Sequence, residues 1–266
     1  MKKIARILLI AKQLSGIKDP RNIFSELKGK DMVFFDVETT GLNQHEHQIT
    51  QIAAIRVRGE NLQTVDKLHK KIALTSKTKE QMLKDKSKAG DKEWTISDAI
   101  KHTKYDELKM PVTEEMKALE EFKDFCESSP AYLIAHNASF DLKLIGTRIG
   151  QINNLGVNDT MMFARLFYIP ALKSLAEAGD EKAKLTVNTM TGKSGKVSSA
   201  LASIAKGLGI DVSNAHTAMA DVQSTIEIFR KMIDYIENKA EEFLNSDTYE
   251  QERQNAVVKE REYKNQ

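Results

Sequence analysis

Short apolar runs with the length of β-strands dominate the part of the chain that follows residue 30. They cover Met32–Glu38, Ile49–Val57 and about Leu62–Ile72, and turn signals at Gly41 and Gly59 separate them. Three strand-like segments in succession, joined by short turns, predict an antiparallel meander.

Strand-like and helix-like patterns alternate in the second half of the chain. Ala131–Ala135 is a short apolar strand, and helical spacing follows from about Ser139 to Ile149. A helix that begins at Thr113 and a last core helix after His216 each present an apolar face. These faces consist of Met116, Leu119, Phe122 and Cys126 in the first helix, and of Val222, Ile226, Phe229, Ile233 and Ile236 in the second. The alternation favours parallel strand pairing, so we expect an α/β fold with a mixed sheet.

The pattern divides the chain into a principal domain with two flanking segments. We expect a helical extension over residues 1–30, a principal domain over 31–237 and a charged tail over 238–266, either a surface helix or a frayed end. The principal domain contains a lysine-rich insertion over about 73–112, for which the pattern predicts a helix near 95–103.

Composition adds limits on location and on metal chemistry. With 266 residues, 41% hydrophobic and 29% charged, the chain has the make-up of a soluble globular protein. The apolar run Ile7–Ala11 is too short to span a membrane and lacks a small-residue cleavage site, so we expect no membrane partner. The single cysteine, Cys126, fits a reducing cytoplasm and excludes a zinc site with several thiolates.

The nearly balanced charge of 40 − 38 = +2 conceals an uneven distribution. Residues 66–92 hold nine lysines and four acids, a local charge of +5. One interpretation is a solvated, mobile loop, and the other is an electrostatic footprint for a polyanion such as a nucleic acid. Composition does not choose between them.

Two acids at the end of the first strand are the first candidates for chemistry. Asp36 and Glu38 are two positions apart, and in a strand such side chains project from the same face. Two like charges at the exit of a buried strand repel each other unless a cation joins them, and Mg²⁺ or Mn²⁺ is the natural partner of clustered carboxylates. The alternative is a strand end whose acids point into solvent, and an isolated Asp-x-Glu favours that alternative.

Two later segments favour the metal site over the solvent-exposed strand end. Together with the segment around Asp36 and Glu38 they form three motifs, which in this order resemble those of the DEDDh family of 3′-to-5′ exonucleases. The motifs are Phe35–Leu42 (FDVETTGL), Ala135–Asp141 (AHNASFD) and His216–Asp221 (HTAMAD). Asp159–Thr160 and Ala164–Arg165 are similar to the family's segment between the second and third motifs. The resemblance covers roughly residues 32–236.

The resemblance implies a ribonuclease-H-like fold, in which helices flank a mixed five-stranded sheet. It also implies that Asp36, Glu38, Asp141 and Asp221 hold two divalent metal ions, Mg²⁺ or Mn²⁺, and that His216 is the general base. The implied reaction hydrolyses terminal phosphodiesters of single-stranded DNA to nucleoside 5′-monophosphates. An exoribonuclease, or a proofreading or accessory subunit that acts with a polymerase or another replication partner, remains an alternative.

His216 and Asp221 would lie about 140° apart on one ideal helix, so we expect Asp221 in the first turns and His216 on the loop or cap before them. By resemblance, five further residues contact the terminal nucleotide: Thr39, Thr40, Leu42, Asn137 and Phe140. Ordinary core packing is an equal alternative for Leu42 and Phe140, and helix capping is an alternative for Asn137.

Three other features are set aside. His45 and His47 alternate in a polar turn, where histidines are most often surface residues. Gly192–Ser194 resembles the end of a phosphate-binding loop, but Val187 stands where that loop needs glycine. Cys126 lies on an apolar helix face and is interpreted as a small core residue.

Overall fold

A computed structural model describes residues 30–58, 61–86, 94–213 and 215–244. The predicted extension over 1–29 and the tail beyond 244 lie outside these residues. The described chain forms two compact units. The sheet unit comprises residues 30–155 and 215–223, and the helical unit comprises 156–213 and 224–244.

The predicted meander is confirmed in the sheet unit. β1 (Asp31–Thr39) pairs antiparallel with β2 (Ile49–Arg58), which pairs antiparallel with β3 (Gln63–Ile72). β5 (Ala131–Ala135) pairs parallel with β1, from Asp31 to Phe34 only. Four consecutive residues of β1, Met32 to Phe35, are buried, and β1 is flanked by β2 on one side and β5 on the other.

Among the described residues the sheet has six strands rather than the five expected from the family resemblance. Their order is β4-β3-β2-β1-β5-β6, where β4 is Val112–Thr113 and β6 is Gly156–Asp159. The prediction that Thr113 begins a helix is wrong, because Thr113 pairs with Ile72 in β4. A strand of two residues has no periodicity of its own and depends on the neighbouring strand.

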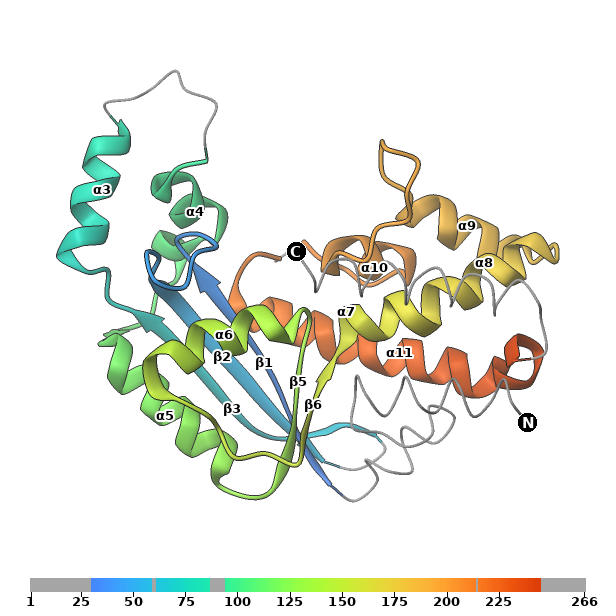
Figure 1. The fold of residues 1–266 in the computed structure, drawn as a ribbon, viewed down its shortest axis with the longest axis horizontal. Coiled ribbons are helices and arrows are strands. Elements are labelled where there is room, and N and C mark those ends of the chain that lie inside the picture. Colours follow the sequence, from blue (N-terminus) through green and yellow to red (C-terminus); the bar gives the residue numbers. More distant parts are fainter. Residues whose placement is uncertain (1–29, 59–60, 87–93, 214, 245–266) are drawn as a thin grey trace. The chain divides into compact units, whose positions relative to one another are not determined.

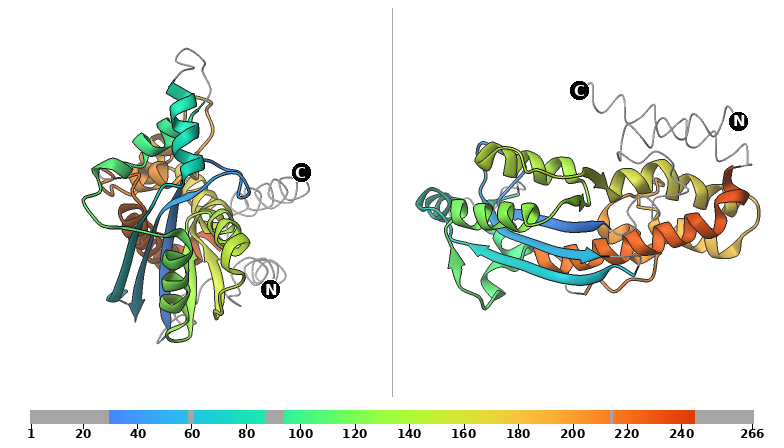
Figure 2. Two further views of the ribbon diagram at one scale, coloured as in Figure 1. Left: turned by 90° about the vertical axis from the view of Figure 1, so that its left-hand side faces the viewer. Right: turned by 90° about the horizontal axis from the view of Figure 1, so that it is seen from below.

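Two helices cover the sheet. α5 (Glu115–Glu127) contacts β2, β3, β5 and α6 (Ala138–Ile149), so both helices lie on one face of the sheet (Figures 1 and 2). The predicted apolar face of α5 is confirmed for Leu119, Phe122 and Cys126, which are buried. Met116 was wrongly included, since it lies in the first turn and is 48% exposed.

The insertion between β3 and α5 is largely ordered. It contains α3 (Ser76–Lys86), α4 (Ile96–His102) and the short 3₁₀ helix η2 (Tyr105–Glu107), and α3 lies beside α4 (Figure 1). The helix expected near 95–103 is confirmed as α4. The loop interpretation is wrong for 76–86, which is helical, and residues 87–93 lie outside the described part. The hydroxyl of Tyr105 donates to the carbonyl of Ile72 at 2.7 Å, which ties the insertion to β3.

A buried ion cluster anchors the start of β1. The carboxylate of Asp31 accepts hydrogen bonds from Arg58 Nε at 2.6 Å, from Ser129 Oγ at 2.9 Å and from Arg56 Nη1 at 3.1 Å. The bonds from Arg58, Ser129 and Arg56 lower the pKa of Asp31 to about 2 against the opposing effect of burial. Asp31 therefore stays charged within the fold.

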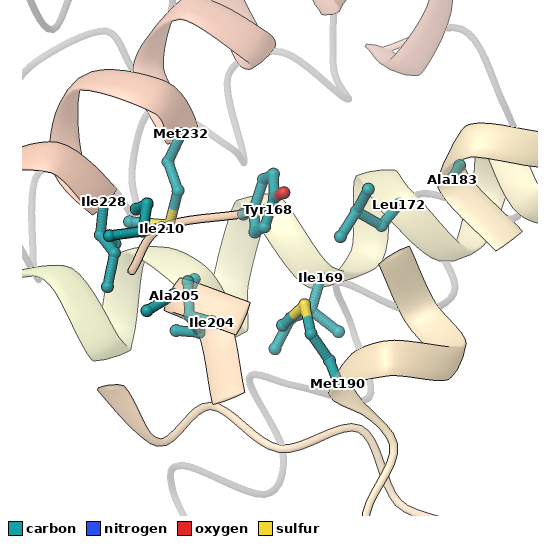
Figure 3. Packing of buried hydrophobic residues seen from close by; sticks show 11 residues of the cluster. Tyr168, Ile169, Leu172, Ala183, Met190, Ile204, Ala205, Ile210, Ile228 and Met232 are labelled. Carbon is teal, nitrogen blue, oxygen red and sulfur yellow. The ribbon is translucent and has the colours of Figure 1, made fainter. Parts of the chain in front are cut away.

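The helical unit has its own core. Besides β6 it contains α7 (Thr160–Phe163), the π-helix η3 (Ala164–Tyr168), α8 (Ile169–Glu177), α9 (Glu181–Met190), α10 (Leu201–Gly207) and the larger part of α11 (Ala218–Leu244). Figure 3 shows Tyr168, Ile204, Ile210, Ile228 and Met232 packed together in this core. The predicted buried face of the last helix is confirmed for Val222, Ile226, Phe229 and Ile233, while the side chain of Ile236 lies outside the described residues.

None of the helices in the described part of the chain combines the length and the apolar character that a membrane span requires.

Candidate metal and catalytic site

Three carboxylates meet at the end of β1. Asp36 and Glu38 project from the same face of this strand, and Asp221 lies in the first turn of α11. One ligand oxygen from each lies within 4.8 Å of the others. All three residues are in the sheet unit, so the site does not depend on the placement of the helical unit.

Asp141 approaches the same place from the first turn of α6. Its side chain is 2% exposed, and its Oδ1 accepts a hydrogen bond from the backbone N–H of Val37 at 3.0 Å. β5 pairs with β1 only as far as Phe34, so this carboxylate occupies the position of a further strand partner. Asp141 is outside the group of three within 4.8 Å, but its charge raises the pKa of both Asp36 and Glu38.

The acids of this cluster resist ionisation. Burial raises the pKa of Asp36 well above its usual value, and the charges of Asp141, Glu38 and Asp221 add to the effect. Burial, followed by the charges of Asp221 and Asp141, raises the pKa of Glu38 to about 8. Burial raises the pKa of Asp221 to about 6 against the hydrogen bond from the His216 backbone. The carboxylate oxygens are held close together although their charges repel each other. Such a group of oxygen ligands fits a hard divalent cation, which would relieve the repulsion.

His216 lies two residues before the first residue of α11, Ala218, as expected from its spacing to Asp221. Its φ of +69° places it in the left-handed region, which is costly for a residue with a side chain. Its backbone N–H donates to Asp221 Oδ1 at 3.3 Å. Burial lowers the pKa of the His216 imidazole, and the nearby charges of His102 and Lys104 lower it further. The ring is therefore neutral near pH 7 and able to accept a proton.

Gln51 is a site-supporting residue that sequence reasoning missed. It is fully buried on β2, opposite Glu38 in the strand register. Its Nε2 donates to the carbonyl of Thr103 at 2.7 Å, and its Oε1 accepts from the N–H of Ala218 at 3.3 Å. One side chain thus joins the insertion to the start of the helix that carries Asp221. The sequence signal for this role was a polar amide side chain within an otherwise mostly apolar strand.

The last residue of β1 and the turn after it include three substrate-contact candidates, Thr39, Thr40 and Leu42. Thr39 Oγ1 donates to the carbonyl of Gly41 at 2.8 Å, and Thr40 Oγ1 lies 3.2 Å from His47 Nδ1. A Cβ at Gly41 would lie 2.5 Å from the His47 ring, so the turn requires glycine there. Leu42 is 82% exposed, which overturns the core alternative for this side chain.

Arg148 of α6 fastens this turn from the other side. Its Nη2 donates to the carbonyl of His47 at 2.7 Å and its Nη1 to the carbonyl of Gln44 at 3.3 Å. Its Nε donates to Glu115 Oε1 at 2.5 Å. His47 is half-buried in this arrangement, whereas His45 is exposed as expected. No local pattern marks this role of Arg148, because the carbonyls that it binds in the turn, those of His47 and Gln44, are 101 and 104 positions away.

The remaining candidates flank Asp141. Asn137 has a φ of +72° directly before α6 and makes no side-chain capping bond, so the capping alternative is wrong. Phe140 is half-buried in the first turn of α6. In the helical unit, Asp159 Oδ1 caps α7 by accepting from Met161 N–H at 2.9 Å, and Arg165 Nε donates to Ser199 Oγ at 2.8 Å.

Cys126 is buried, and burial raises the pKa of its thiol to about 12. It is an inert core residue, as predicted from its helix face.

A mixed sheet whose central strand ends in paired carboxylates, facing an aspartate that follows a neutral histidine, defines a candidate divalent-metal hydrolase site. The particular family follows from comparison with known proteins. Residues 33–229 match the exonuclease family model (RNase T). The chain therefore belongs to this exonuclease family, which confirms the family expected from the three sequence motifs.

Relatives of known sequence support the assignment. The chain is 30% identical over 212 residues to the PolC-type DNA polymerase III of Staphylococcus haemolyticus, a match that covers 78% of this chain and 12% of the relative. It is 29% identical over 211 residues to the Staphylococcus aureus (strain Newman) protein of the same name, with the same coverage. The chain thus spans only about an eighth of the length of these relatives.

Solved structures support the fold. Escherichia coli exonuclease I in complex with a dT13 oligonucleotide matches with a TM-score of 0.54 and 21% identity, over 78% of this chain and 43% of the other. The zinc-bound complex of the same enzyme with single-stranded DNA matches with a TM-score of 0.52 and 20% identity, over 79% and 43%. The predicted α/β, ribonuclease-H-like fold is confirmed.

Proposed function

We propose that this chain is a metal-dependent 3′-to-5′ exonuclease that removes nucleoside 5′-monophosphates from single-stranded DNA. The observation that carries the proposal is the convergence of Asp36, Glu38 and Asp221 within 4.8 Å. His216 stands beside them with a backbone hydrogen bond to Asp221. Membership of the exonuclease family supports the reaction class.

The four acids Asp36, Glu38, Asp141 and Asp221 are the proposed ligands of two divalent ions, Mg²⁺ or Mn²⁺. The donor set fits, because it consists of carboxylate oxygens whose raised pKa values reflect unrelieved repulsion. Such ions, when bound, supply charge stabilisation for the attacking and leaving oxygens of a phosphodiester.

The chain's own residues would move the proton and hold the substrate. The imidazole of His216 accepts a proton from the attacking water while the water oxygen bonds to phosphorus. The bond from phosphorus to the 3′ oxygen of the preceding nucleotide breaks, and that oxygen takes up a proton from solvent. Thr39 and Thr40 would contact the terminal nucleotide, and the exposed Leu42 could press against its base.

Asn137 and Phe140 are proposed to line the same nucleotide pocket, because they precede Asp141 within one helical turn, at the N-cap and in the first turn of α6. The aromatic ring of Phe140 would contact a base.

DNA is preferred to RNA because the relatives are named DNA polymerases. That name also supports the alternative in which the chain proofreads or assists in complex with a polymerase. An exoribonuclease remains the competing substrate choice, and matched DNA and RNA oligonucleotides would distinguish the two.

The test is digestion of a 5′-labelled single-stranded oligonucleotide by the full chain, with Mg²⁺, with Mn²⁺ and with a chelator. We expect a ladder that shortens from the 3′ end only when metal is present. Asp36→Asn is the matched control and should remove the ladder. Products that start at the 5′ end, or cleavage that persists in chelator, would overturn the proposal.

A further inference from the structure

A row of aromatic rings leads from His216 to the solvent. The ring of His102 stacks on His216 with centroids 3.9 Å apart. The ring of Trp94 meets His102 edge to face, with centroids 5.3 Å apart and an interplanar angle of 82°. Trp94 is 64% exposed. These three rings, here called the aromatic row, all belong to the sheet unit.

Hydrogen bonds fix the helix that carries the aromatic row. Trp94 directly precedes Thr95, whose side chain forms a reciprocal capping box with Asp98 at the start of α4. His102 is the last residue of α4, and the following carbonyl of Thr103 accepts the hydrogen bond from Gln51. Because both ends of α4 are fixed, the exposed face of Trp94 is presented at low entropic cost.

Positive charge accompanies the row. Lys101 lies in the last turn of α4, and Lys104 has a left-handed φ of +51° two residues beyond it. Lys104 is close enough to lower the pKa of both His216 and Asp221. A cation beside exposed rings, next to an acidic cluster, suits a polyanion that carries flat bases.

We propose that Trp94 and His102 bind a nucleobase of the single strand, upstream of the nucleotide at the 3′ end. This rests on the proposed exonuclease function, because the scissile phosphate must then lie beside His216. A strand that leaves this point along the aromatic row passes over Trp94. Stacking on an aromatic side chain tolerates any base and contributes about 1–3 kcal/mol per base. The insertion would thereby contribute to substrate binding.

The chain carries its own probe for this contact. Trp94 is its single tryptophan, so emission excited selectively from tryptophan reports on this position alone. The full-length protein is titrated with a single-stranded oligothymidylate in Ca²⁺ or chelator. Tryptophan emission and the anisotropy of a 5′-labelled copy are followed in parallel. We expect emission to be quenched over the same concentration range in which anisotropy rises.

Variants sharpen the test. Trp94→Ala should weaken binding by roughly 5- to 150-fold, the range that corresponds to stacking of one base. Trp94→Phe should recover most of the affinity. In Trp94→Ala the KM should rise, while kcat at saturating substrate should stay the same. Leu185→Ala, which removes another exposed apolar side chain (68% exposed) in the helical unit, is the matched control and should bind normally.

The outcomes separate the two proposals. Binding and cleavage with unquenched emission, together with normal affinity of Trp94→Ala, would overturn the aromatic row but leave the exonuclease intact. Absence of both binding and cleavage in the unaltered protein would overturn the exonuclease and the row together.

Discussion

The side-chain amide of Gln51 donates a hydrogen bond of 2.7 Å to the backbone carbonyl of Thr103. The same side chain accepts from the N–H of Ala218, so a buried residue of β2 fixes two segments that border the acidic cluster. At this point α4 has just ended and α11 begins, so Gln51 holds the end of one helix connection and the first residue of the other helix. Gln51 therefore positions Asp221 and His216 without contacting the reacting atoms.

Gln51→Leu should lower kcat by about 10–100-fold, because both backbone partners lose their fixed position and remain buried. Steady-state kinetics would measure this, and Gln51→Glu is the informative companion. The glutamate keeps the acceptor for Ala218 but loses the donor to Thr103, so it should recover part of the activity. Equal kcat values for Gln51→Leu and the unaltered protein would contradict a positioning role.

Asp141 accepts the hydrogen bond from Val37 and is a proposed metal ligand, and substitution can separate the structural role from the proposed one. Asp141→Asn keeps an oxygen acceptor for the Val37 N–H and should unfold at nearly the same temperature as the unaltered protein, while losing activity. Asp141→Ala should also be less stable, by about 1–3 kcal/mol, because it leaves a buried N–H without a partner. Thermal melts paired with nuclease assays distinguish the two. Full activity of the asparagine variant would argue against metal binding by Asp141.

Metal binding should release protons and strengthen as pH rises. In the metal-free protein the pKa of Glu38 is raised to about 8, so this carboxyl group is largely protonated near pH 7, and burial raises the pKa of Asp36 well above normal in the same direction. A divalent cation must displace these protons. Calorimetric titration with Mn²⁺ in buffers of different ionisation enthalpy should report proton release at pH 7 and less at pH 9. Release that does not depend on pH would contradict this.

The same shifts fix the sign of the stability change. An acid whose pKa is higher in the folded than in the unfolded state binds more protons when folded, so unfolding becomes easier as pH rises between those two values. In chelator the melting temperature should therefore fall between about pH 5 and pH 8. Mn²⁺ should raise it more at pH 8 than at pH 5.

His216→Ala should slow the chemical step by about 10²–10⁴-fold and leave oligonucleotide binding intact. Because the pKa of His216 is lowered, the ring stays neutral to a lower pH than a free histidine would. The acid limb of kcat at saturating metal should accordingly lie below roughly pH 6.5. If the fall of kcat at low pH persists unchanged in His216→Ala, the titrating group is not His216.

Asp31→Asn should reduce the free energy of unfolding by about 3–5 kcal/mol, because the buried guanidinium of Arg56 loses its carboxylate. The pKa of Asp31 is lowered to about 2, so its contribution is complete above the unfolded value near 4 and is lost as pH falls toward 2. Urea denaturation at pH 7 and at pH 3 would measure both effects. The difference between variant and unaltered protein should shrink at the lower pH.

Local periodicity was sufficient to predict most elements but not their exceptions. The strand patterns identified β1, β2, β3 and β5, because buried strands leave uninterrupted apolar runs. They missed β4, a strand of two residues that exists only because Lys71 and Ile72 offer backbone partners. Met116 has the right spacing for the buried face of α5, but it lies in the first turn of the helix and is 48% exposed.

The residues of the site also fall into those that sequence patterns predict and those that they miss. Asp36 and Glu38 could be paired from their spacing, and the three motifs supplied Asp141, Asp221 and His216. The roles of Gln51 and Arg148 could not be predicted, because each binds backbone groups that are distant in the sequence: Arg148 contacts the carbonyl of His47, 101 positions away. The ring contact between His102 and His216 likewise joins segments that no local pattern relates.

β5 stops pairing with β1 before Val37, and this has a consequence for when the acidic cluster forms during folding. Val37 relies on a carboxylate 104 positions further along the chain, where a longer neighbouring strand would have offered a carbonyl. Such a distant contact closes a large loop and is slow to form. Partly folded chains should consequently lack high-affinity cation binding, so added metal would stabilise the finished fold by mass action and would not accelerate refolding.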